Sequence, residues 1–266
     1  MREIKMVAMD MDGTILSHND DGVYISNSAK DAIRKLKEAG IKTAIATGRS
    51  YGLLKDLIVE LGMEEDYHVM CNGAATLAPS GEFINLHGLP HDAYRLLVER
   101  FSAKEIPFAV FDADLSYCLP YTMHAHAHAY RESIVKEDLL AIPYITKFVV
   151  GPYSHAVIEE LTKDIPISLA LSVFQGVDYA EIWPLGLHKG TAVEAVAKLY
   201  GIGINEVMAL GDGGNDTQML EYVGWGVAMG NATDDVKSYA NAVTDTIDED
   251  GLAKAIDKYV FKRDFS

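Results

Sequence analysis

The stretch KMVAMDMDGTIL, residues 5–16, decides the fold and also poses the main chemical problem of the chain. Residues 4–9 are apolar on both faces apart from Lys5, which is typical of a central strand in a parallel sheet. The strand ends at Asp10 and Asp12, two carboxylates one residue apart. Such acids repel each other, and they are costly at the edge of a core unless something compensates them. The rest of the chain has to supply that compensation.

The composition is that of a globular protein without a nucleic-acid surface. The 266 residues suffice for one large or two moderate domains, and 49% of them are hydrophobic. With 23 basic against 39 acidic residues, the formal charge of −16 argues against the basic patch that nucleic acids require. No apolar run approaches the ~20 residues of a membrane span, and the first residues are too polar for a signal peptide. Cys71 and Cys118 lack metal-type spacing, so we expect a cytoplasmic location.

Strand and helix patterns alternate along both ends of the chain, and this alternation predicts a doubly wound parallel sheet of the α/β class. In the first part, after residues 4–9, the patterns predict helices over 26–39 and 51–61 and strands over 41–48 and 67–74. In the last part they predict helices over 189–200, 216–222, 233–239 and 249–260, with strands over 206–212 and 224–229. Between these parts the pattern changes to mixed strands and helices. We therefore predict a Rossmann-like core of residues 1–82 and 186–266, with residues 83–185 as an inserted α+β cap domain.

Polar residues follow each predicted core strand. Because ligands of open α/β sheets bind at the carboxyl ends of the strands, we expect these residues to converge. They are Asp10, Met11 and Asp12; Thr47, Gly48 and Arg49; Asn72 and Gly73; and Asp212, Asn215 and Asp216, with Lys189 opening a helix after the insert. Carboxylate oxygens in such number suit a hard cation such as Mg²⁺, which also binds substrate phosphate. A cation at a helix start, as at Lys189, predicts an acidic partner nearby.

Four segments in order resemble the motifs of the haloacid dehalogenase-like hydrolase superfamily. They are DMDGT at residues 10–14, ATGR at 46–49, KG at 189–190 and GDGGND at 211–216. A large insert between the second and third motifs is similar to the Cof-type branch of phosphatases, as are NGA at 72–74 and VAMGNA at 227–232. One departure is Gly214, where a bulkier residue is frequent. The resemblance covers the whole predicted core and implies a HAD-like catalytic domain under a cap that determines substrate specificity.

The resemblance implies roles for the motif residues. Asp10 would be the nucleophile that attacks phosphorus and forms an aspartyl-phosphate, and Asp12 would be the general acid and then the general base. Thr47 and Lys189 would complete the catalytic set by holding phosphoryl oxygens and neutralising charge. The residues that would bind phosphate or substrate are Met11, Thr47, Gly48, Arg49, Asn72, Lys189 and Asn215.

The same resemblance implies Mg²⁺ as the cofactor. Its ligands would be Asp10, the backbone carbonyl of Asp12, and Asp212, with Asp216 either a ligand or an outer partner. The reaction would be hydrolysis of a small phosphorylated metabolite such as a sugar phosphate, without nucleic-acid or membrane partners. Carbon–halogen hydrolases of the superfamily lack the second aspartate, so Asp12 disfavours a dehalogenase.

Two other functions stay open at this point. A phosphomutase of the same fold would return the phosphoryl group to the sugar, and a phospho-receiver or regulatory module would use Asp, Lys and an acidic pocket. The predicted third strand ends without an acid, and this argues against a receiver. The run HAHAHA, with His124, His126 and His128, could bind a transition metal or phosphate if it is a strand, and would otherwise be a solvated edge. Neither the substrate nor the oligomeric state, monomer or dimer, can be read from the sequence.

Overall fold

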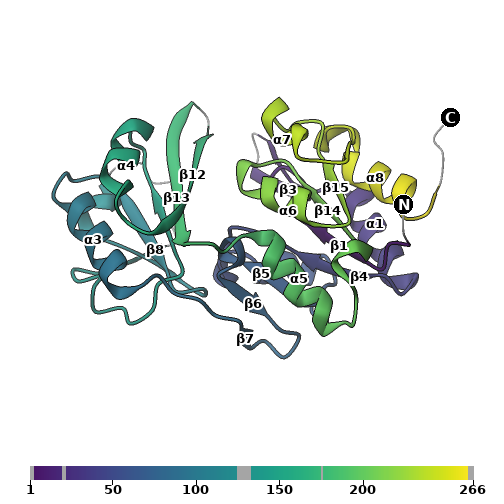
Figure 1. Cartoon of the computed structure of the whole chain (residues 1–266), viewed down its shortest axis with the longest axis horizontal. Helices are drawn as coiled ribbons and strands as arrows, with labels where there is room; N and C mark the ends of the chain where they lie inside the picture. Colours follow the sequence, from purple (N-terminus) through teal and green to yellow (C-terminus); the bar gives the residue numbers. More distant parts are fainter. Residues whose placement is uncertain (1–2, 20–21, 125–132, 175, 263–266) are drawn as a thin grey trace. The chain divides into compact units, whose positions relative to one another are not determined.

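The apolar run before Asp10 forms strand β1 (Met6–Met9) in this computed structural model, which describes residues 3–19, 22–124, 133–174 and 176–262. The described chain divides into two units (Figure 1). One unit holds the residues up to 48, residues 55–84 and the residues from 188 onward; the other holds residues 49–54 and 85–187. Among the described residues, no helix is both long enough and apolar enough to cross a membrane.

The first unit contains most of the secondary structure. Its strands besides β1 are β2 (Leu16–Asn19), β3 (Gly22–Ile25), β4 (Lys42–Ile45), β5 (His68–Met70), β6 (Ala75–Leu77), β7 (Phe83–Ile84), β14 (Val207–Gly211), β15 (Trp225–Ala228) and β16 (Ala242–Val243). Its helices are α1 (Asn27–Glu38), α2 (Lys55–Glu60), α5 (Lys189–Leu199), α6 (Thr217–Tyr222), α7 (Asp234–Ser238) and α8 (Gly251–Tyr259). Short 3₁₀ turns are η2 (Cys71–Gly73), η4 (Ile204–Glu206), η5 (Gly214–Asp216) and η6 (Ile247–Glu249).

A five-stranded sheet in the order β16-β15-β14-β1-β4 forms the centre of this unit, and every neighbouring pair is parallel. Strand β1 is buried along its whole length, with β4 on one side and β14 on the other. The chain leaves β1 toward one edge of the sheet and returns later on the other side, so β1 lies at the switch point where such sheets bind ligands. The prediction of a parallel α/β core is confirmed.

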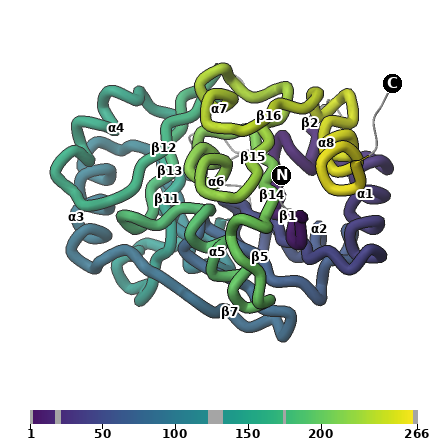
Figure 2. Tube along the Cα trace, turned by 45° about the vertical axis from the view of Figure 1, so that its right-hand side comes forward, coloured from purple at the N-terminus to yellow at the C-terminus, as the bar shows by residue number. Residues whose placement is uncertain are grey.

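Helices cover the sheet because their apolar residues recur at helical spacing. In α1, Ala29, Ile33 and Leu36 are buried, and the side chain of Ser26 caps the helix by accepting the backbone N–H of Ala29 at 3.2 Å. Helices α1 and α8 contact each other (Figure 2). Helices α5 and α6 pack together on the alternate side chains of β1, among them Met6 and Ala8. The first helix and its serine cap were therefore predictable from local pattern.

Three local predictions differ from the structure. The predicted third core strand, β5, pairs antiparallel with β6 in a separate sheet ordered β5-β6-β7, and meets the end of β4 only at an isolated bridge between Ala46 and Val69. The reason lies in His68, whose ring Nδ1 accepts the backbone N–H of Ile45 at 3.2 Å in place of a strand carbonyl. The helix predicted over 51–61 is broken into η1 (Tyr51–Leu53) and α2. The segment before α1, for which no strand was predicted, contains the hairpin β2–β3.

The buried His68 makes stability depend on pH. Its other ring nitrogen, Nε2, donates to the carbonyl of Met63 at 3.0 Å, so both nitrogens are used by the neutral ring. Burial lowers its pKa to about 4, against an ordinary value of 6.5. In acid the unfolded chain takes up the proton first, so this contribution is complete above pH ~6.5 and is lost as the pH falls toward 4. We expect a loss of about 3 kcal/mol in the free energy of unfolding over that range.

Urea unfolding at a series of pH values checks this expectation with His68→Gln, whose amide can both accept and donate but does not titrate. As the pH falls from 6.5 toward 4, the free energy of unfolding of this variant should fall by about 3 kcal/mol less than that of the unaltered protein. The same change at the exposed His91 is the control. Identical pH profiles for His68→Gln and the unaltered protein would contradict the assignment.

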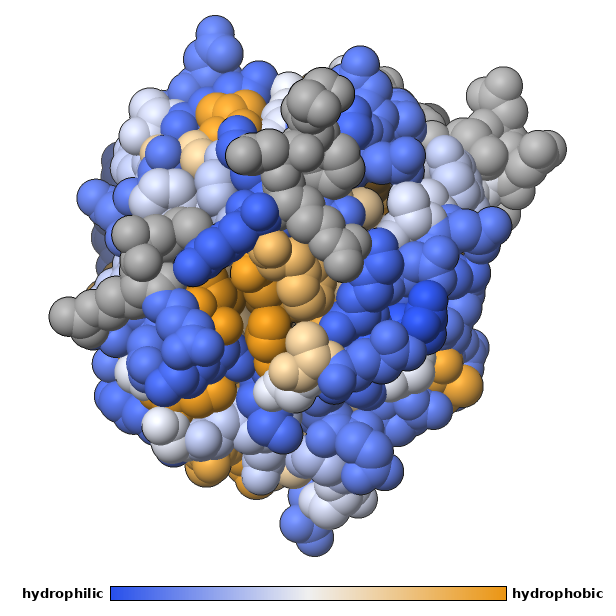
Figure 3. All heavy atoms as spheres, turned by 90° about the vertical axis from the view of Figure 1, so that its right-hand side faces the viewer, coloured by the Kyte–Doolittle hydropathy of each residue, from blue (hydrophilic) through white to orange (hydrophobic). Residues whose placement is uncertain are grey.

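Figure 3 shows one face of the molecule, which is largely hydrophilic with a hydrophobic patch near its centre. A cavity of about 490 Å³ lies at the amino ends of β1 and β4. It is lined by Glu3, Ile4, Lys5, Ala39, Gly40, Ile41, Lys42, Ile202, Tyr259, Val260 and Lys262. This cavity is at the opposite end of the strands from Asp10.

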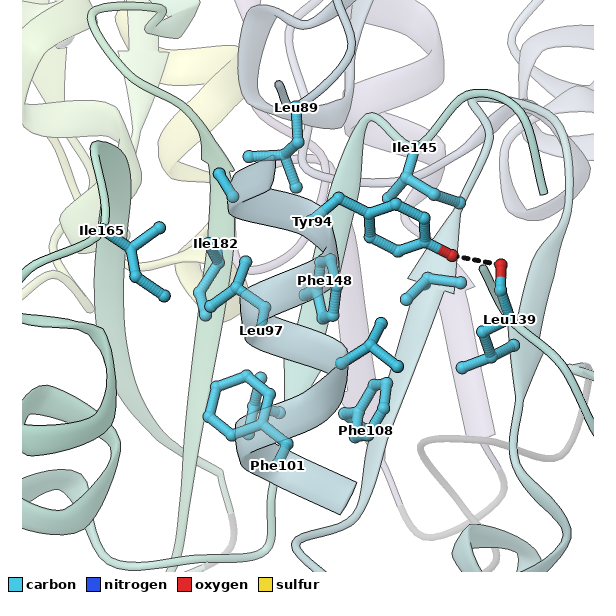
Figure 4. Close-up of a cluster of buried hydrophobic side chains, with 14 of the residues drawn as sticks. Leu89, Tyr94, Leu97, Phe101, Phe108, Leu139, Ile145, Phe148, Ile165 and Ile182 are labelled. Carbon is cyan, nitrogen blue, oxygen red and sulfur yellow. Dashed lines mark hydrogen bonds between the residues drawn. The ribbon is translucent and has the colours of Figure 1, made fainter. Parts of the chain in front are cut away.

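The second unit is built on a six-stranded sheet in the order β10-β9-β8-β11-β13-β12. Its strands are β8 (Phe108–Phe111), β9 (Ser116–Cys118), β10 (Ile134–Val135), β11 (Lys147–Val150), β12 (Ile167–Phe174) and β13 (Val177–Pro184); its helices are α3 (His91–Ser102) and α4 (His155–Thr162), with the turns η1 and η3 (Pro120–His124). One apolar cluster joins both helices to the sheet (Figure 4). In it the rings of Phe108 and Phe148 stack at 5.6 Å, and the Tyr94 hydroxyl donates to the carbonyl of Leu139.

Residues 49–54 pack within this second unit although the chain reaches them directly after β4. The backbone N–H groups of Tyr51 and Gly52 donate to the carbonyls of Ala113 and Asp114 at 2.8 and 2.9 Å, and Leu53 packs against a small apolar cluster of β8 and β9. These contacts hold residues 49–54 in the second unit, and the predicted helix is divided there into η1 and α2. The chain therefore passes between the units after residues 48, 54, 84 and 187. That the second unit selects the substrate stays a prediction.

Candidate active site

The carboxyl ends of three neighbouring parallel strands supply the candidate site. Asp10 follows β1, Thr47 follows β4 and Asp212 follows β14. Lys189 is the first residue of α5, whose amino end is capped by His188: its ring Nδ1 accepts the backbone N–H of Thr191 at 3.3 Å. The expected convergence at this end of the sheet is present.

Lys189 is the centre of a buried ion cluster. Its Nζ lies 2.6 Å from Oδ1 of Asp10 and 2.6 Å from Oδ1 of Asp216. The side chains of Lys189 and Asp216 are fully buried, and that of Asp10 is 8% exposed. Because Lys189 is a cation at a helix start, we expected an acidic partner nearby. It has two, Asp10 and Asp216, which come from opposite ends of the sequence.

Asp216 uses both of its oxygens within the protein. While Oδ1 accepts from Lys189, Oδ2 accepts the backbone N–H of Asp212 at 3.1 Å and that of Gly213 at 2.9 Å. These bonds close the loop after β14 and fix the backbone that carries Asp212. Of the two roles left open for Asp216, its bonds favour that of an outer partner.

Asp212 is held by neutral donors. Its Oδ1 accepts from the hydroxyl of Thr14 at 3.1 Å, and its Oδ2 accepts from the side-chain amide of Asn231 at 3.0 Å. Gly13 makes the close approach possible: its φ is +77°, and a Cβ there would lie 2.2 Å from Oδ2 of Asp212. The loop after β1 therefore touches the loop after β14 through Thr14 and Gly13.

Burial and mutual repulsion raise the pKa values of the acids. Burial raises the pKa of Asp10 well above its usual range, and the charges of Asp216, Asp212 and Asp12 add to this, while Lys189 opposes it. Burial, followed by the charge of Asp216, raises the pKa of Asp212 to about 7. For Lys189, burial alone would lower the pKa, but the charges of Asp10 and Asp216 outweigh it and raise the pKa. The protein by itself leaves this acidic cluster short of positive charge.

The acids can hold a metal ion. Carboxylate oxygens of Asp10, Asp212 and Asp216 lie within 4.8 Å of one another, and one lysine faces these three acids. A divalent cation would balance the two remaining charges, and hard oxygen donors of this kind fit Mg²⁺. Repulsion among these acids adds to burial in raising their pKa values, so the donor set and its charge both fit the predicted cofactor.

Thr47, Asn72 and Asn215 are linked by hydrogen bonds. The carbonyl of Thr47 accepts the backbone N–H of Asn72 at 3.1 Å, and the side-chain amide of Asn215 donates to Oδ1 of Asn72 at 3.0 Å. Thr47 and Asn72 are both buried. Asn72 has φ of 56°, a left-handed conformation that asparagine tolerates better than most residues. The structure therefore brings together predicted phosphate-binding residues from three separate motifs.

The remaining predicted site residues follow β1 or β4 or belong to the HAHAHA run. Met11 is buried, and its carbonyl accepts backbone N–H groups of the loop that follows β1, including that of Leu16 at 2.7 Å. Asp12 and Gly48 are half-buried at the ends of β1 and β4. Arg49 belongs to the second unit, where it donates to the carbonyl of Leu53 at 3.3 Å. The roles predicted for these residues stay predictions. His126 and His128 lie outside the described residues, as does the side chain of His124.

Sequence reasoning assigned no role to Thr14 or Asn231, the two donors that hold Asp212. Both stand inside segments that the sequence analysis quoted, DMDGT and VAMGNA. Their hydrogen bonds join residues that are 198 and 19 positions apart, so no local pattern could have paired them with Asp212. The sequence did offer one signal for Thr14 and Asn231, because each segment lies at the end of a predicted core strand.

Comparison with known proteins agrees with this geometry. Residues 7–256 match the sequence profile of the haloacid dehalogenase-like hydrolases. The chain is 29% identical to the 5-amino-6-(5-phospho-D-ribitylamino)uracil phosphatase YcsE of Bacillus subtilis, over 97% of this chain and 96% of that protein. It is 29% identical to a solved structure of BT1666 from Bacteroides thetaiotaomicron, described among phosphatases of the same superfamily, with a TM-score of 0.80 over 96% and 94% of the two chains.

A further solved structure, that of the sugar phosphatase BT4131, has the same fold. It is 24% identical, with a TM-score of 0.82 over 96% of this chain and 98% of that chain. At this identity the likeness speaks for the fold alone. Together, the profile match and the relatives confirm the predictions about fold and family that the four ordered motifs supported.

Proposed function

The chain belongs to the haloacid dehalogenase-like hydrolase family, and from that premise we propose that it is a Mg²⁺-dependent phosphatase of small phosphorylated metabolites. The observation that carries the proposal is the buried contact of Lys189 with Asp10 and Asp216, next to Asp212, at the switch point of the sheet. A nucleophile, a fixed cation and a set of metal ligands are what transfer of a phosphoryl group needs, because its catalysis is mostly positioning and charge stabilisation.

In the first step, a carboxylate oxygen of Asp10 attacks phosphorus. The bond between phosphorus and the alcohol oxygen breaks, the leaving oxygen takes a proton from Asp12, and an aspartyl-phosphate forms. Lys189 holds Asp10 at 2.6 Å and supplies positive charge beside the transferring group. Bound Mg²⁺ would favour the ionised form of Asp10 and draw charge from the phosphoryl oxygens.

In the second step, the carboxylate of Asp12 takes a proton from water as that water attacks phosphorus. The bond between phosphorus and Asp10 breaks, and inorganic phosphate leaves with Asp12 protonated again. Asp12 suits this exchange because it is half-buried, whereas Asp10 is almost fully buried against Lys189. Two carboxylates in different surroundings can divide nucleophilic and acid–base roles in this way.

For the metal, we assign Asp10, the carbonyl of Asp12 and Asp212 as ligands. Asp216 acts on the site through its bonds to Lys189 and to the backbone of Asp212. Thr47, the Gly48 amide and Asn215 hold phosphoryl oxygens, with Asn72 orienting Asn215 through their hydrogen bond. Arg49 would contact the rest of the substrate.

The proposed substrate class is a phosphomonoester of a small polar metabolite, such as a sugar or sugar-alcohol phosphate. Support comes from YcsE, whose named substrate carries its phosphate on a ribityl chain, and which matches over nearly the full length of both proteins. A phosphomutase would need the same Asp10 and Asp12, so only the products separate the two reactions.

A panel assay tests the proposal. Purified protein is incubated with sugar phosphates, the phosphorylated ribitylaminouracil, pyridoxal phosphate and flavin mononucleotide, with Mg²⁺ or with EDTA. We expect inorganic phosphate from at least one compound with Mg²⁺, none with EDTA, and recovery when Mg²⁺ is restored. Formation of an isomeric sugar phosphate without free phosphate would favour the mutase. A stable phosphoprotein without turnover would favour a receiver or regulatory module.

A further inference from the structure

The side chain of Asn231 hydrogen-bonds both to the loop after β1 and to the carboxylate of Asp212. It lies three residues beyond the end of β15. Its Nδ2 donates to the carbonyl of Gly13 at 3.0 Å and to Oδ2 of Asp212 at 3.0 Å. Its Oδ1 accepts the backbone N–H of Ile247 at 3.0 Å. Three loops at the same end of the sheet thus meet on one amide.

The partners fix which end of this amide is nitrogen. A carbonyl and a carboxylate can only accept, and a backbone N–H can only donate, so the observed orientation satisfies every partner and its reverse satisfies none. Both hydrogens of Nδ2 are used by Gly13 and Asp212. An aspartate at this position would keep the bond to Ile247 but would lose both donated bonds.

The loop that carries Asn231 is itself held in place. The backbone N–H of Met229 donates to the carbonyl of Gly211 at 3.0 Å, and that of Gly230 donates to the carbonyl of Asp245 at 3.0 Å. Asn231 therefore extends from a fixed backbone, and its side chain can transmit that position to Asp212. Because Asn231 is exposed, it contributes little to the apolar core.

We propose that Asn231 is a positioning residue for the metal site. It holds Asp212 close to the loop that carries Asp10 and Asp12, so that ligands from both loops can bind the same Mg²⁺. This inference rests on the proposed function. The bond to Oδ2 orients the Asp212 carboxylate and uses one of its lone pairs, leaving others for a cation. The bond to the Gly13 carbonyl holds the Gly13–Thr14 peptide, which directly follows the peptide that carries the Asp12 carbonyl. Partners of this kind commonly change metal affinity about 10- to 100-fold when they are removed.

Isothermal titration of Mg²⁺ into the unaltered protein and into Asn231→Ala tests the inference without any substrate. We expect a Kd for Mg²⁺ about 10- to 100-fold higher in the variant. The matched control is Asn241→Ala, which removes an asparagine that accepts the Gly226 N–H at 2.7 Å at the other end of the sheet. Its Mg²⁺ affinity should equal that of the unaltered protein. Asn231→Ser, which is too short for either acceptor, serves if the alanine variant does not fold.

Activity at rising Mg²⁺ gives a second readout, since a residue that acts only through the metal should change the half-saturating Mg²⁺ concentration and leave kcat at saturating Mg²⁺ close to normal. If the unaltered protein binds Mg²⁺ and Asn231→Ala binds it within twofold as tightly, the inference is overturned while the proposed function stands. A low kcat that excess Mg²⁺ does not restore would also overturn it. Failure of the unaltered protein to bind Mg²⁺ would overturn the proposed function and this inference with it.

Discussion

Asp10→Asn is expected to abolish phosphate release, with a fall in kcat of roughly 10⁴-fold or more, as is usual when a covalent nucleophile is removed. The amide has nearly the shape of the carboxylate, but it is a poor nucleophile and has no charge to attract a metal. The geometry around it should persist, because Lys189 keeps its contact with Asp216 at 2.6 Å. The loss should therefore be one of chemistry and not of folding.

The stability of Asp10→Asn against urea shows whether activity is lost through the chemistry or through misfolding. Burial raises the pKa of Asp10, followed by the charge of Asp216, so the ionised form is disfavoured where it stands. Removing that charge should leave the urea midpoint in EDTA unchanged or higher. The control is Asp56→Asn, an exposed acid on α2, which should keep full activity. Turnover by Asp10→Asn at the normal rate would show that another group attacks phosphorus.

Lys189→Met is expected to have the second large effect, and here both activity and stability should fall. The substitution leaves two buried carboxylates, Asp10 and Asp216, without their shared cation. Breaking a buried ion pair by removing one partner typically costs about 3–5 kcal/mol. The loss of positive charge beside the phosphoryl group should lower kcat by roughly 10²- to 10³-fold.

The same helix offers the control. Lys198→Met removes the partner of Glu194 in an exposed pair at 3.0 Å, where a change of about 0–1 kcal/mol is expected. Urea unfolding in EDTA and with saturating Mg²⁺ provides the measurement. Mg²⁺ should stabilise Lys189→Met more than the unaltered protein, because the variant has one more uncompensated negative charge. Equal losses of stability at positions 189 and 198 would refute the role of Lys189 as the central cation.

The parts of the site that the sequence could predict are those set by local pattern and by the geometry of parallel sheets. Asp10, Thr47 and Asp212 each follow a buried apolar run, and adjacent parallel strands end at the same edge. The acidic partner of Lys189 was predictable from electrostatics alone, since a cation at a helix start is unfavourable without one.

The features that the sequence could not predict depend on contacts between distant segments. The division of Asp216 between Lys189 and two backbone N–H groups, and the bonds of Thr14 and Asn231 to Asp212, arise only when separate loops fold together. The position of β5 was missed because a single ring nitrogen of His68 takes the N–H that a core strand would have used. The helical pattern that begins at residue 51 likewise gives no sign that residues 49–54 belong to one unit and α2 to the other.

The packing of residues 49–54 bears on how this architecture can be rebuilt. If the inserted residues 85–187 were exchanged for the insert of another protein, Tyr51 and Gly52 would lose the carbonyls of Ala113 and Asp114 that now accept their N–H groups. Those losses would fall within a few residues of Thr47. The exchangeable module is therefore discontinuous, made of the long insert and a six-residue segment upstream, and a functional chimera has to carry both from the same parent.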